Sequence, residues 1–235
     1  MSSLLAQEIL DWDWIGGNLD EIWARTLEHV ELTVLAVAIG FVISLPLGIL
    51  AHRRRVLFPP ITFVAGILYT IPSLALFVAL IPFTGLSYAT AEIGLVSYTL
   101  LILIRNVVGG LDGVPDDVRN AALGMGYGQR QLLWRIDLPL ALPVIVAGLR
   151  IAVVTTVGLV TVTALIGLGG YGHFILLGLR QPAAGATPTI VGAVLSVVLA
   201  VVADAGLLAA QRGLTPWSRR RGPRAGSTRR LAPEV

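Results

Sequence analysis

Long uncharged runs separated by short polar stretches dominate the chain. An α-helix needs about 20 mostly apolar residues to cross the hydrocarbon core of a bilayer. The hydrophobic pattern predicts five such spans, at about residues 32–51, 61–81, 86–108, 142–168 and 189–210. The first span contains Gly40 and Pro46, which a membrane helix tolerates when neighbouring groups satisfy the freed carbonyls.

The stretch 56–91 carries no charge and is too long for a single crossing. Closely spaced proline and glycine interrupt regular structure. The cluster Pro82-Phe83-Thr84-Gly85 therefore predicts the boundary between the second and third spans.

Composition strengthens the membrane interpretation and removes several chemistries. The chain is 55% hydrophobic and 13% charged, whereas soluble domains average about 25% charged residues. Every basic residue is an arginine, and there is no cysteine. The missing lysine excludes a P-loop lysine and a Schiff base, and the missing cysteine excludes disulfides and thiolate sites. Three scattered histidines do not suggest a metal site. We expect an all-α integral membrane protein with no catalytic residues.

The placement of the arginines predicts an orientation. Short cytoplasmic loops are enriched in basic residues. Arginines follow the first span, lie between the third and fourth spans, and fill the C-terminal tail, while the opposite side holds only Arg25 and Arg180. The N-terminal stretch is acidic. We therefore expect the N-terminus outside and the C-terminus in the cytoplasm, which agrees with an odd number of spans.

The two ends differ from the membrane domain, which we expect over residues 29–211. Residues 1–28 contain Trp12, Trp14 and Trp23 among acids and glycines, a composition typical of an external, interfacial segment with an aromatic anchor. Residues 212–235 form an arginine-rich tail that we expect to be disordered and cytoplasmic. Beside a membrane, we expect such a tail to lie on anionic lipid or simply to be solvated, rather than to bind nucleic acid.

The loop at residues 112–139 has helical signals of its own. Pro115 and the two acids after it suit the first turn of a helix. An apolar stripe follows at i, i+3, i+4 and i+7, formed by Val118, Ala121, Ala122 and Met125. Three glycines end this helix, and a second helical segment follows at 129–136. We expect Asp137-Leu138-Pro139 to break that segment before the fourth span.

The spacing within this loop resembles a known signature. Asn120-Ala121-Ala122, Gly126, Ile136 and Leu138-Pro139 stand at the positions of the EAA loop of permease subunits in bacterial ATP-binding-cassette importers. The resemblance implies that the loop is a coupling helix that docks on a cytoplasmic ATPase. It also implies that Ala121, Ala122 and Gly126 are the small docking residues. Asn120 replaces the usual glutamate and so removes a charge.

Further stretches are similar to one branch of these permeases. They are Thr70–Leu76, Ile104–Asn106 and Ala164–Gly172, and they resemble segments of glycine betaine, carnitine and choline permeases over roughly residues 30–210. Methionine and other amino-acid permeases share much of this layout, so a methionine permease stays open as an alternative.

The resemblance also implies partners and a location. They are cytoplasmic ATPase subunits that use the ATP, a second permease chain of the same or another sequence, an external solute-binding protein and the lipid of the bacterial inner membrane. No cofactor bound by this chain, no metal and no nucleic acid is expected. A secondary transporter is disfavoured because five spans do not divide into matched halves. A membrane-embedded enzyme would need a constellation of nucleophile, histidine or metal ligands at membrane depth.

Several residues are candidates for the transport pathway or for structural pairing. They are Tyr69, Pro72, Ser73, Arg105, Asn106 and Arg150. Arg150 lies inside the fourth span, where a charge is costly, and we expect it to pair with Asp137 or Asp204 rather than to contact solute. The remaining alternative is that its side chain only reaches the cytoplasmic surface. Arg105 and Asn106 either contact the loop or mark an arginine snorkelling to the interface.

Aromatic residues and a glycine-rich stretch complete the candidates. An aromatic surface for a quaternary ammonium ligand, favoured by cation–π attraction, would draw on Tyr69, Phe77, Tyr88, Tyr98 and Tyr171. The alternative is that each of these side chains serves packing. The stretch 167–172 predicts an outward-facing turn that could touch a binding protein.

Overall fold

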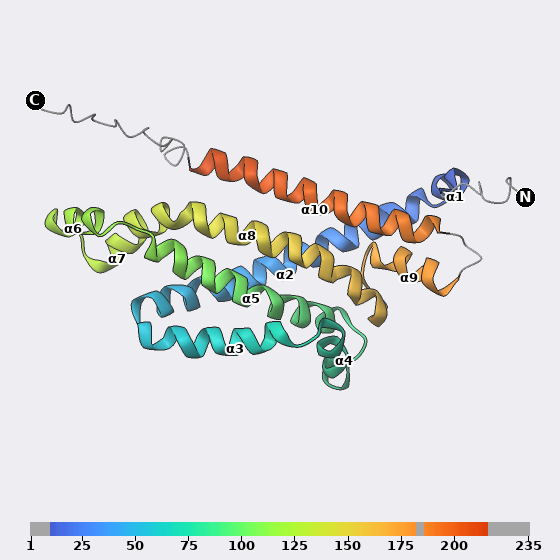
Figure 1. The fold of residues 1–235 in the computed structure, drawn as a ribbon, viewed down its shortest axis with the longest axis horizontal. Coiled ribbons are helices and arrows are strands. Elements are labelled where there is room, and N and C mark those ends of the chain that lie inside the picture. The colour runs from blue at the N-terminus through green and yellow to red at the C-terminus, as the bar shows by residue number, and fades with distance from the viewer. Residues whose placement is uncertain (1–9, 182–185, 216–235) are drawn as a thin grey trace, which may run out of the picture.

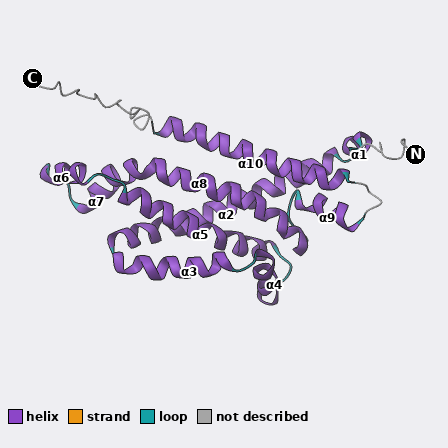
Figure 2. Ribbon diagram, viewed as in Figure 1, coloured by secondary structure: helices purple, strands orange, loops and turns teal. Residues whose placement is uncertain are grey.

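The computed structural model describes residues 10–181 and 186–215, and every regular element within them is helical (Figures 1 and 2). Of the tail expected to be disordered over residues 212–235, residues 212–214 belong to the last helix, and the part beyond residue 215 lies outside the described residues. Four helical stretches are long and apolar enough to cross a membrane. They are α2 (Leu19–Arg53), α5 (Tyr88–Asp112), the continuous run Gln129–Ile166 and α10 (Thr187–Leu214).

The run Gln129–Ile166 joins four elements end to end. They are α7 (Gln129–Leu132), the π-helical turn η2 (Leu133–Asp137), α8 (Leu138–Val160) and the 3₁₀ turn η3 (Thr161–Ile166). The shorter elements are α1 (Trp12–Gly17), η1 (Arg55–Leu57), α3 (Phe58–Thr70), α4 (Ser73–Thr84), α6 (Asp116–Gly124) and α9 (Gly172–Arg180).

The second span is broken rather than straight. We expected one crossing at 61–81, but α3 and α4 meet at a bend of 96° (Figure 1). Proline has no N–H and excludes the preceding residue from the helical region, and Ile71, just before Pro72, is extended with ψ 129°. Pro82, expected to end this span, lies inside α4, and the chain turns three residues later at Gly85 with φ 70°.

The expected break at Asp137-Leu138-Pro139 is wrong. The helix continues from Gln129 through this sequence, and the π-helical turn η2 lies directly before α8. A π turn is wider than an α turn. It gives space next to Pro139, whose ring would otherwise clash with the carbonyl of Arg135 and whose missing N–H cannot donate to it.

Small residues let α5 approach its two neighbours closely. On α2, Ala36, Gly40, Ser44 and Gly48 are buried at intervals of four residues. A Cβ on Gly40 would lie 1.9 Å from Thr99 Oγ1, and a Cβ on Gly48 would lie 2.5 Å from Val107 Cγ1. Helix α8 approaches α5 equally closely, because a Cβ on Gly148 would lie 2.4 Å from Asn106 Cβ. Such contacts are a main source of helix association in membranes.

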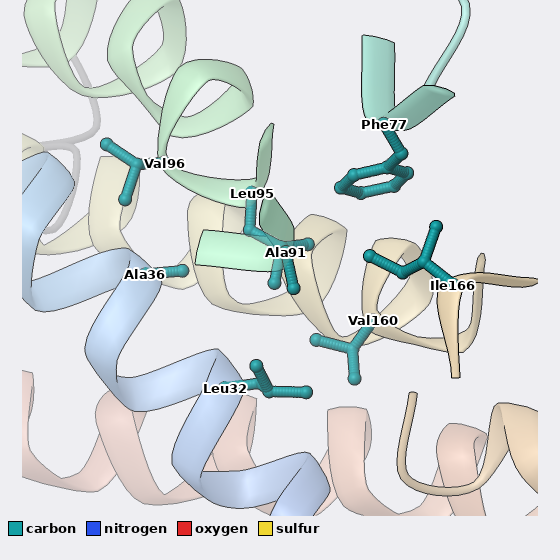
Figure 3. Close-up of a cluster of buried hydrophobic side chains, with 8 residues drawn as sticks. All are labelled: Leu32, Ala36, Phe77, Ala91, Leu95, Val96, Val160 and Ile166. Atoms are coloured by element: carbon teal, nitrogen blue, oxygen red, sulfur yellow. The ribbon is translucent and has the colours of Figure 1, made fainter. Parts of the chain in front are cut away.

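A buried apolar cluster closes one end of the bundle. Figure 3 shows its members on α2, α4, α5, α8 and η3, namely Leu32, Ala36, Phe77, Ala91, Leu95, Val96, Val160 and Ile166. Phe77 is fully buried, and a Cβ on Gly94 would meet its ring. The bend at Pro72 thus returns α4 to the bundle and places Phe77 in the core.

The last long helix, α10, lies along the outside of the bundle (Figure 1). Only 6% of its apolar window is buried, compared with 56% for α5. It packs on α8 and α9, and lipid or another protein must cover its remaining apolar faces.

We predict that Gly48→Ala loosens the contact between α2 and α5. The stiff valine at position 107 cannot move away cheaply, and overpacking of this kind costs about 1–3 kcal/mol. The thermal midpoint of the purified protein in detergent should fall by several degrees. Gly109→Ala is the matched control, because a Cβ there meets nothing within 4 Å. Equal midpoints for the two variants would contradict the packing argument.

Candidate functional site

The segment 113–137 projects from one end of the bundle (Figure 1). We call this the basic end, because Arg53, Arg54, Arg55, Arg130 and Arg135 all lie there. Helix α6 ends in a Schellman motif, in which Gly126 N donates to Leu123 O and Tyr127 N donates to Ala122 O. Gly126 has φ 87°, which favours glycine, so the turn itself requires this residue.

The structure separates the residues of the signature into two groups. Asn120, Ala121 and Gly126 are exposed on the projecting segment. The others lie deeper: Ala122 is buried, and Ile136, Leu138 and Pro139 are partly buried where the segment enters α8. The expected apolar stripe on α6 is therefore not a buried face, because Ala122 alone of its four members is buried.

Apolar side chains on this segment are open to solvent. They are Val118, Leu123, Met125 and Trp134. Trp134 is 59% exposed, and sequence reasoning missed it because it follows two buried leucines in an apolar run. Exposed apolar groups of this size on a polar end of a protein are typical of a docking surface.

Ion pairs tie the helix ends together at the basic end. Asp112, at the end of α5, accepts two hydrogen bonds from Arg55 at 2.7 Å and lies 2.5 Å from His52 Nδ1. Arg119 on α6 pairs with Asp137 at 2.9 Å. None of these pairs was predicted, because their partners are 18 to 60 residues apart in the sequence.

The bend between α3 and α4 gathers one group of candidate residues. Pro72 is exposed and Ser73 partly buried at the break. Tyr98 of α5 donates its hydroxyl hydrogen to the carbonyl oxygen of Ile71, which the broken helix leaves free. The ring of Tyr69 lies edge-on to Tyr98, with centroids 6.0 Å apart. Irregular backbone at membrane depth is tolerated where protein buries it or where it lines a water-filled cavity.

The five candidate aromatics do not form one surface in this chain. Phe77 lies in the core cluster, Tyr98 is buried at the helix break, and Tyr171 is buried against His29 at the glycine-rich turn. Packing explains these three. Tyr69 alone of the set is exposed.

Arg150 pairs with Asp204, as one of the two predicted alternatives had it. The guanidinium donates two hydrogen bonds of 2.8 Å to the carboxylate across α8 and α10. Seven residues away on both helices, Gln211 donates to the carbonyl of Pro143 at 3.1 Å. Asp137 is not the partner, since it binds Arg119. Two polar contacts thus define the antiparallel register of α10 on α8.

Arg105 and Asn106 have different surroundings. Arg105 is exposed on α5, as a snorkelling arginine would be. Asn106 packs against Gly148 and donates to the carbonyl of Ile102 within its own helix. Neither contacts the segment 113–137 in the described hydrogen bonds and ion pairs.

The glycine-rich turn at 167–172 lies at the end opposite the basic end and packs on His29. A carbonyl accepts and an amide donates, so His29 Nε2 donates to Val157 O at 3.0 Å and Nδ1 accepts from Tyr171 N at 3.3 Å. A Cβ on Gly170 would lie 2.5 Å from His29 Cβ. Sequence reasoning missed this role because an isolated histidine carries no local signal. His173, beside the turn, pairs with Glu21 at 3.1 Å. Among the described residues, no group of three or more His, Asp or Glu side chains is arranged to hold a metal ion.

Comparisons with known proteins agree on one family. A profile of the family described as "Binding-protein-dependent transport system inner membrane component" matches residues 36–215. The choline transport system permease protein OpuBB of Bacillus subtilis is 34% identical over 201 residues, covering 85% of this chain and 91% of that protein. The osmoprotectant import permease protein OsmW of Salmonella typhimurium is 37% identical over 204 residues, with coverages of 85% and 94%.

A solved structure shares the fold. A chain of the MetNI methionine ABC transporter, in an inward-facing conformation, superposes with a TM-score of 0.73 at 25% identity. The match covers 88% of this chain and all of that one.

We predict that Tyr98→Phe destabilises the break between α3 and α4. Removal of the hydroxyl leaves the Ile71 carbonyl without its donor, at a cost of about 1–3 kcal/mol, so the thermal midpoint should fall. Tyr69→Phe is the control, since it keeps the ring contact and the Ile71 hydrogen bond. A midpoint for Tyr98→Phe equal to that of the control would refute this role of the hydroxyl.

We also predict that the pair Arg150–Asp204 holds α10 on α8. Arg150→Ala and Asp204→Ala should each lower the yield of monodisperse protein from membranes, because each leaves one charge without its partner. The exchange Arg150→Asp with Asp204→Arg should recover part of the loss. An exchanged variant no better than the single variants would show that the pairing itself does not matter.

Proposed function

The chain belongs to the family of binding-protein-dependent transport system inner membrane components and is a permease subunit of an ATP-binding-cassette importer; we propose that its solute is an osmoprotectant such as glycine betaine, carnitine or choline. Two relatives that are 34% and 37% identical are named for choline and for osmoprotectants. The methionine transporter chain shares the fold at 25% identity, so methionine is the competing solute.

The proposed coupling function depends on one observation, the exposed apolar side chains of the projecting segment. In our proposal Val118, Met125 and Trp134 contact a cytoplasmic ATPase, with Asn120 and the small residues Ala121 and Gly126 beside them. Ile136, Leu138 and Pro139 join this surface directly to α8, because the helix is continuous from Gln129. Closure of the ATPases would therefore move α8. ATP is bound and hydrolysed by the partner, and this chain performs no catalysis.

The proposed orientation places the basic end in the cytoplasm, with the N-terminus outside. Arginines from three separate segments gather at this end, which fits the enrichment of basic residues in short cytoplasmic loops. At the opposite end, α9 and the glycine-rich turn would face an external solute-binding protein. The membrane is the bacterial cytoplasmic membrane.

A second permease chain would complete the pathway. The chain leaves large apolar faces of α3, α4 and α10 exposed, including Phe63, Phe83 and Val201. Lipid covers part of this surface, and we assign another part to a permease partner, identical or related. The pathway would pass the bend at Pro72, where Tyr69 offers an aromatic face for a quaternary ammonium group.

The docking function is tested by Trp134→Ala. Truncation of a tryptophan at the centre of an interface costs about 2 kcal/mol or more, so ATPase affinity should fall by about 30-fold or more. Co-purification of the ATPase and solute uptake into proteoliposomes report the loss. Trp23→Ala is the matched control, because Trp23 is equally exposed, at 64%, but lies far from the basic end. Undiminished ATPase binding by Trp134→Ala would contradict the assignment of this surface.

The same proteoliposomes test the solute. With the ATPase and the binding protein present, we expect ATP-dependent uptake of labelled glycine betaine, carnitine or choline. Uptake of methionine alone would replace the proposed solute with the competing one. Uptake that persists without any ATPase would overturn the importer mechanism itself.

A further inference from the structure

Helix α6 is held to the bundle by very few side chains. Of its nine residues, Ala122 is buried and Arg119 is partly buried, and the other seven are exposed. The chain enters α6 through Gly113-Val114-Pro115 and leaves it through a turn that contains Gly126 and Gly128. The buried methyl group of Ala122 resists compression, but as a nondirectional apolar contact it does not hold α6 when the helix moves away from the bundle. Arg119 is therefore the one directional side-chain contact of α6 with the bundle among the described residues.

Arg119 joins three segments at once. Its Nε donates to Asp137 Oδ1 at 2.9 Å, in the π turn that leads into α8. Its Nη2 donates to the carbonyl oxygen of Leu111 at 2.6 Å, in the last turn of α5. Its third contact, Nη1 to Asp116 Oδ1 at 3.6 Å, stays within α6. A planar guanidinium suits this task because its donors point in fixed directions.

The two carboxylates around Arg119 differ in exposure. The Asp137 side chain is 9% exposed and that of Asp116 is 89% exposed. Charged hydrogen bonds are strong where water is excluded and contribute little at an exposed surface. The ion pair with Asp137 is therefore the one that holds α6 on the bundle. The exposed ion pair with Asp116 serves as an internal control.

We propose that Arg119 is a positioning residue that couples α6 to the starting turn of α8 and to the end of α5, so that the three move as one body. The proposal rests on the proposed docking of the ATPase on the segment 113–137. A displacement of α6 would pass through the guanidinium into both helices. Asp112, next to Leu111, would pass it on to α2 and η1 through His52 and Arg55.

The test compares Asp137→Asn with Asp116→Asn in the complete complex in proteoliposomes. Asp137→Asn keeps the shape of the side chain but removes the charge that Arg119 binds. We expect it to retain ATPase co-purification and ATP hydrolysis, while the solute transported per ATP falls about tenfold, the scale of one charged hydrogen bond. Asp116→Asn should couple normally. Arg119→Lys should transport an intermediate amount of solute per ATP, since one ammonium cannot contact both Asp137 and Leu111 as the guanidinium does.

A distance measurement adds a readout that does not depend on transport. The chain has no cysteine, so spin labels on Asp117→Cys and Leu140→Cys, both exposed sites on α6 and α8 and outside the proposed docking surface, would be the only labels on this chain. The distance distribution should be narrow and unchanged between nucleotide-free and ATP-bound complexes. In the Asp137→Asn variant the distance distribution should broaden. If Asp137→Asn fails to accumulate, the same measurement is made on Arg119→Lys with the same two labels.

The outcomes separate the two proposals. Normal coupling and an unchanged distance distribution in Asp137→Asn would overturn the role of Arg119 while leaving the docking function intact. Equal losses in Asp137→Asn and Asp116→Asn would also overturn it, because an exposed charge would then matter as much as a buried one. Failure of the unmodified chain to bind an ATPase would instead refute the proposed function.

Discussion

The close approach of α2 and α5 is the contact on which the rest of the structure depends. Apolar side chains gain little from leaving lipid for another helix, so membrane helices associate through tight packing and polar contacts. The buried stripe of Ala36, Gly40, Ser44 and Gly48 lets α5 lie against α2 without space for a side chain between them. Gly148 does the same for α8 on the other side of α5. With α5 held between these two helices, its tyrosine, threonine and asparagine side chains reach fixed positions on its neighbours.

Polar contacts then position the helices and turns that are not held by the close packing of small residues. The hydroxyl of Tyr98 supports the break at Pro72, and His29 holds the glycine-rich turn through both ring nitrogens. Along α10, where apolar burial is small, two polar contacts spaced alike on both helices define the register. At the basic end the ion pairs of Asp112 and Arg119 connect the ends of α2, α5, α6 and α8. Each of these groups is satisfied by a residue far away in the chain.

This distance explains what could be predicted from the sequence. Span number and approximate bounds follow from local counts of apolar residues, and the EAA-like spacing of Asn120 to Pro139 is equally local, so the family was recognisable before the structure. The broken span was not, because Pro72 and Pro82 have similar neighbours. At Pro72 the carbonyl of the preceding Ile71 accepts from the hydroxyl of Tyr98, 27 residues away, whereas the carbonyl of Ile81, before Pro82, accepts from the nearby Gly85 N. Trp134 and Asp137, the ion-pair partner of Arg119, both lie in the π turn, whose wider geometry shifts the helical register from its expected course. The partner of Arg150 could be narrowed to two carboxylates from the sequence, because a charge within a span requires an ion-pair partner.

The unbroken run from Gln129 to Ile166 has a consequence of scale. At 1.5 Å per residue its 38 residues form a rod of about 57 Å, well beyond the roughly 30 Å of the hydrocarbon core. A rod of that length acts as a lever: a tilt of about 10° around its midpoint displaces each tip by about 5 Å in opposite directions. The π turn near one tip and the 3₁₀ turn at the other are where its hydrogen-bond spacing changes, so both tips can adjust while the shaft stays stiff. A small push at one face of the membrane becomes an opposite swing of several ångströms at the other.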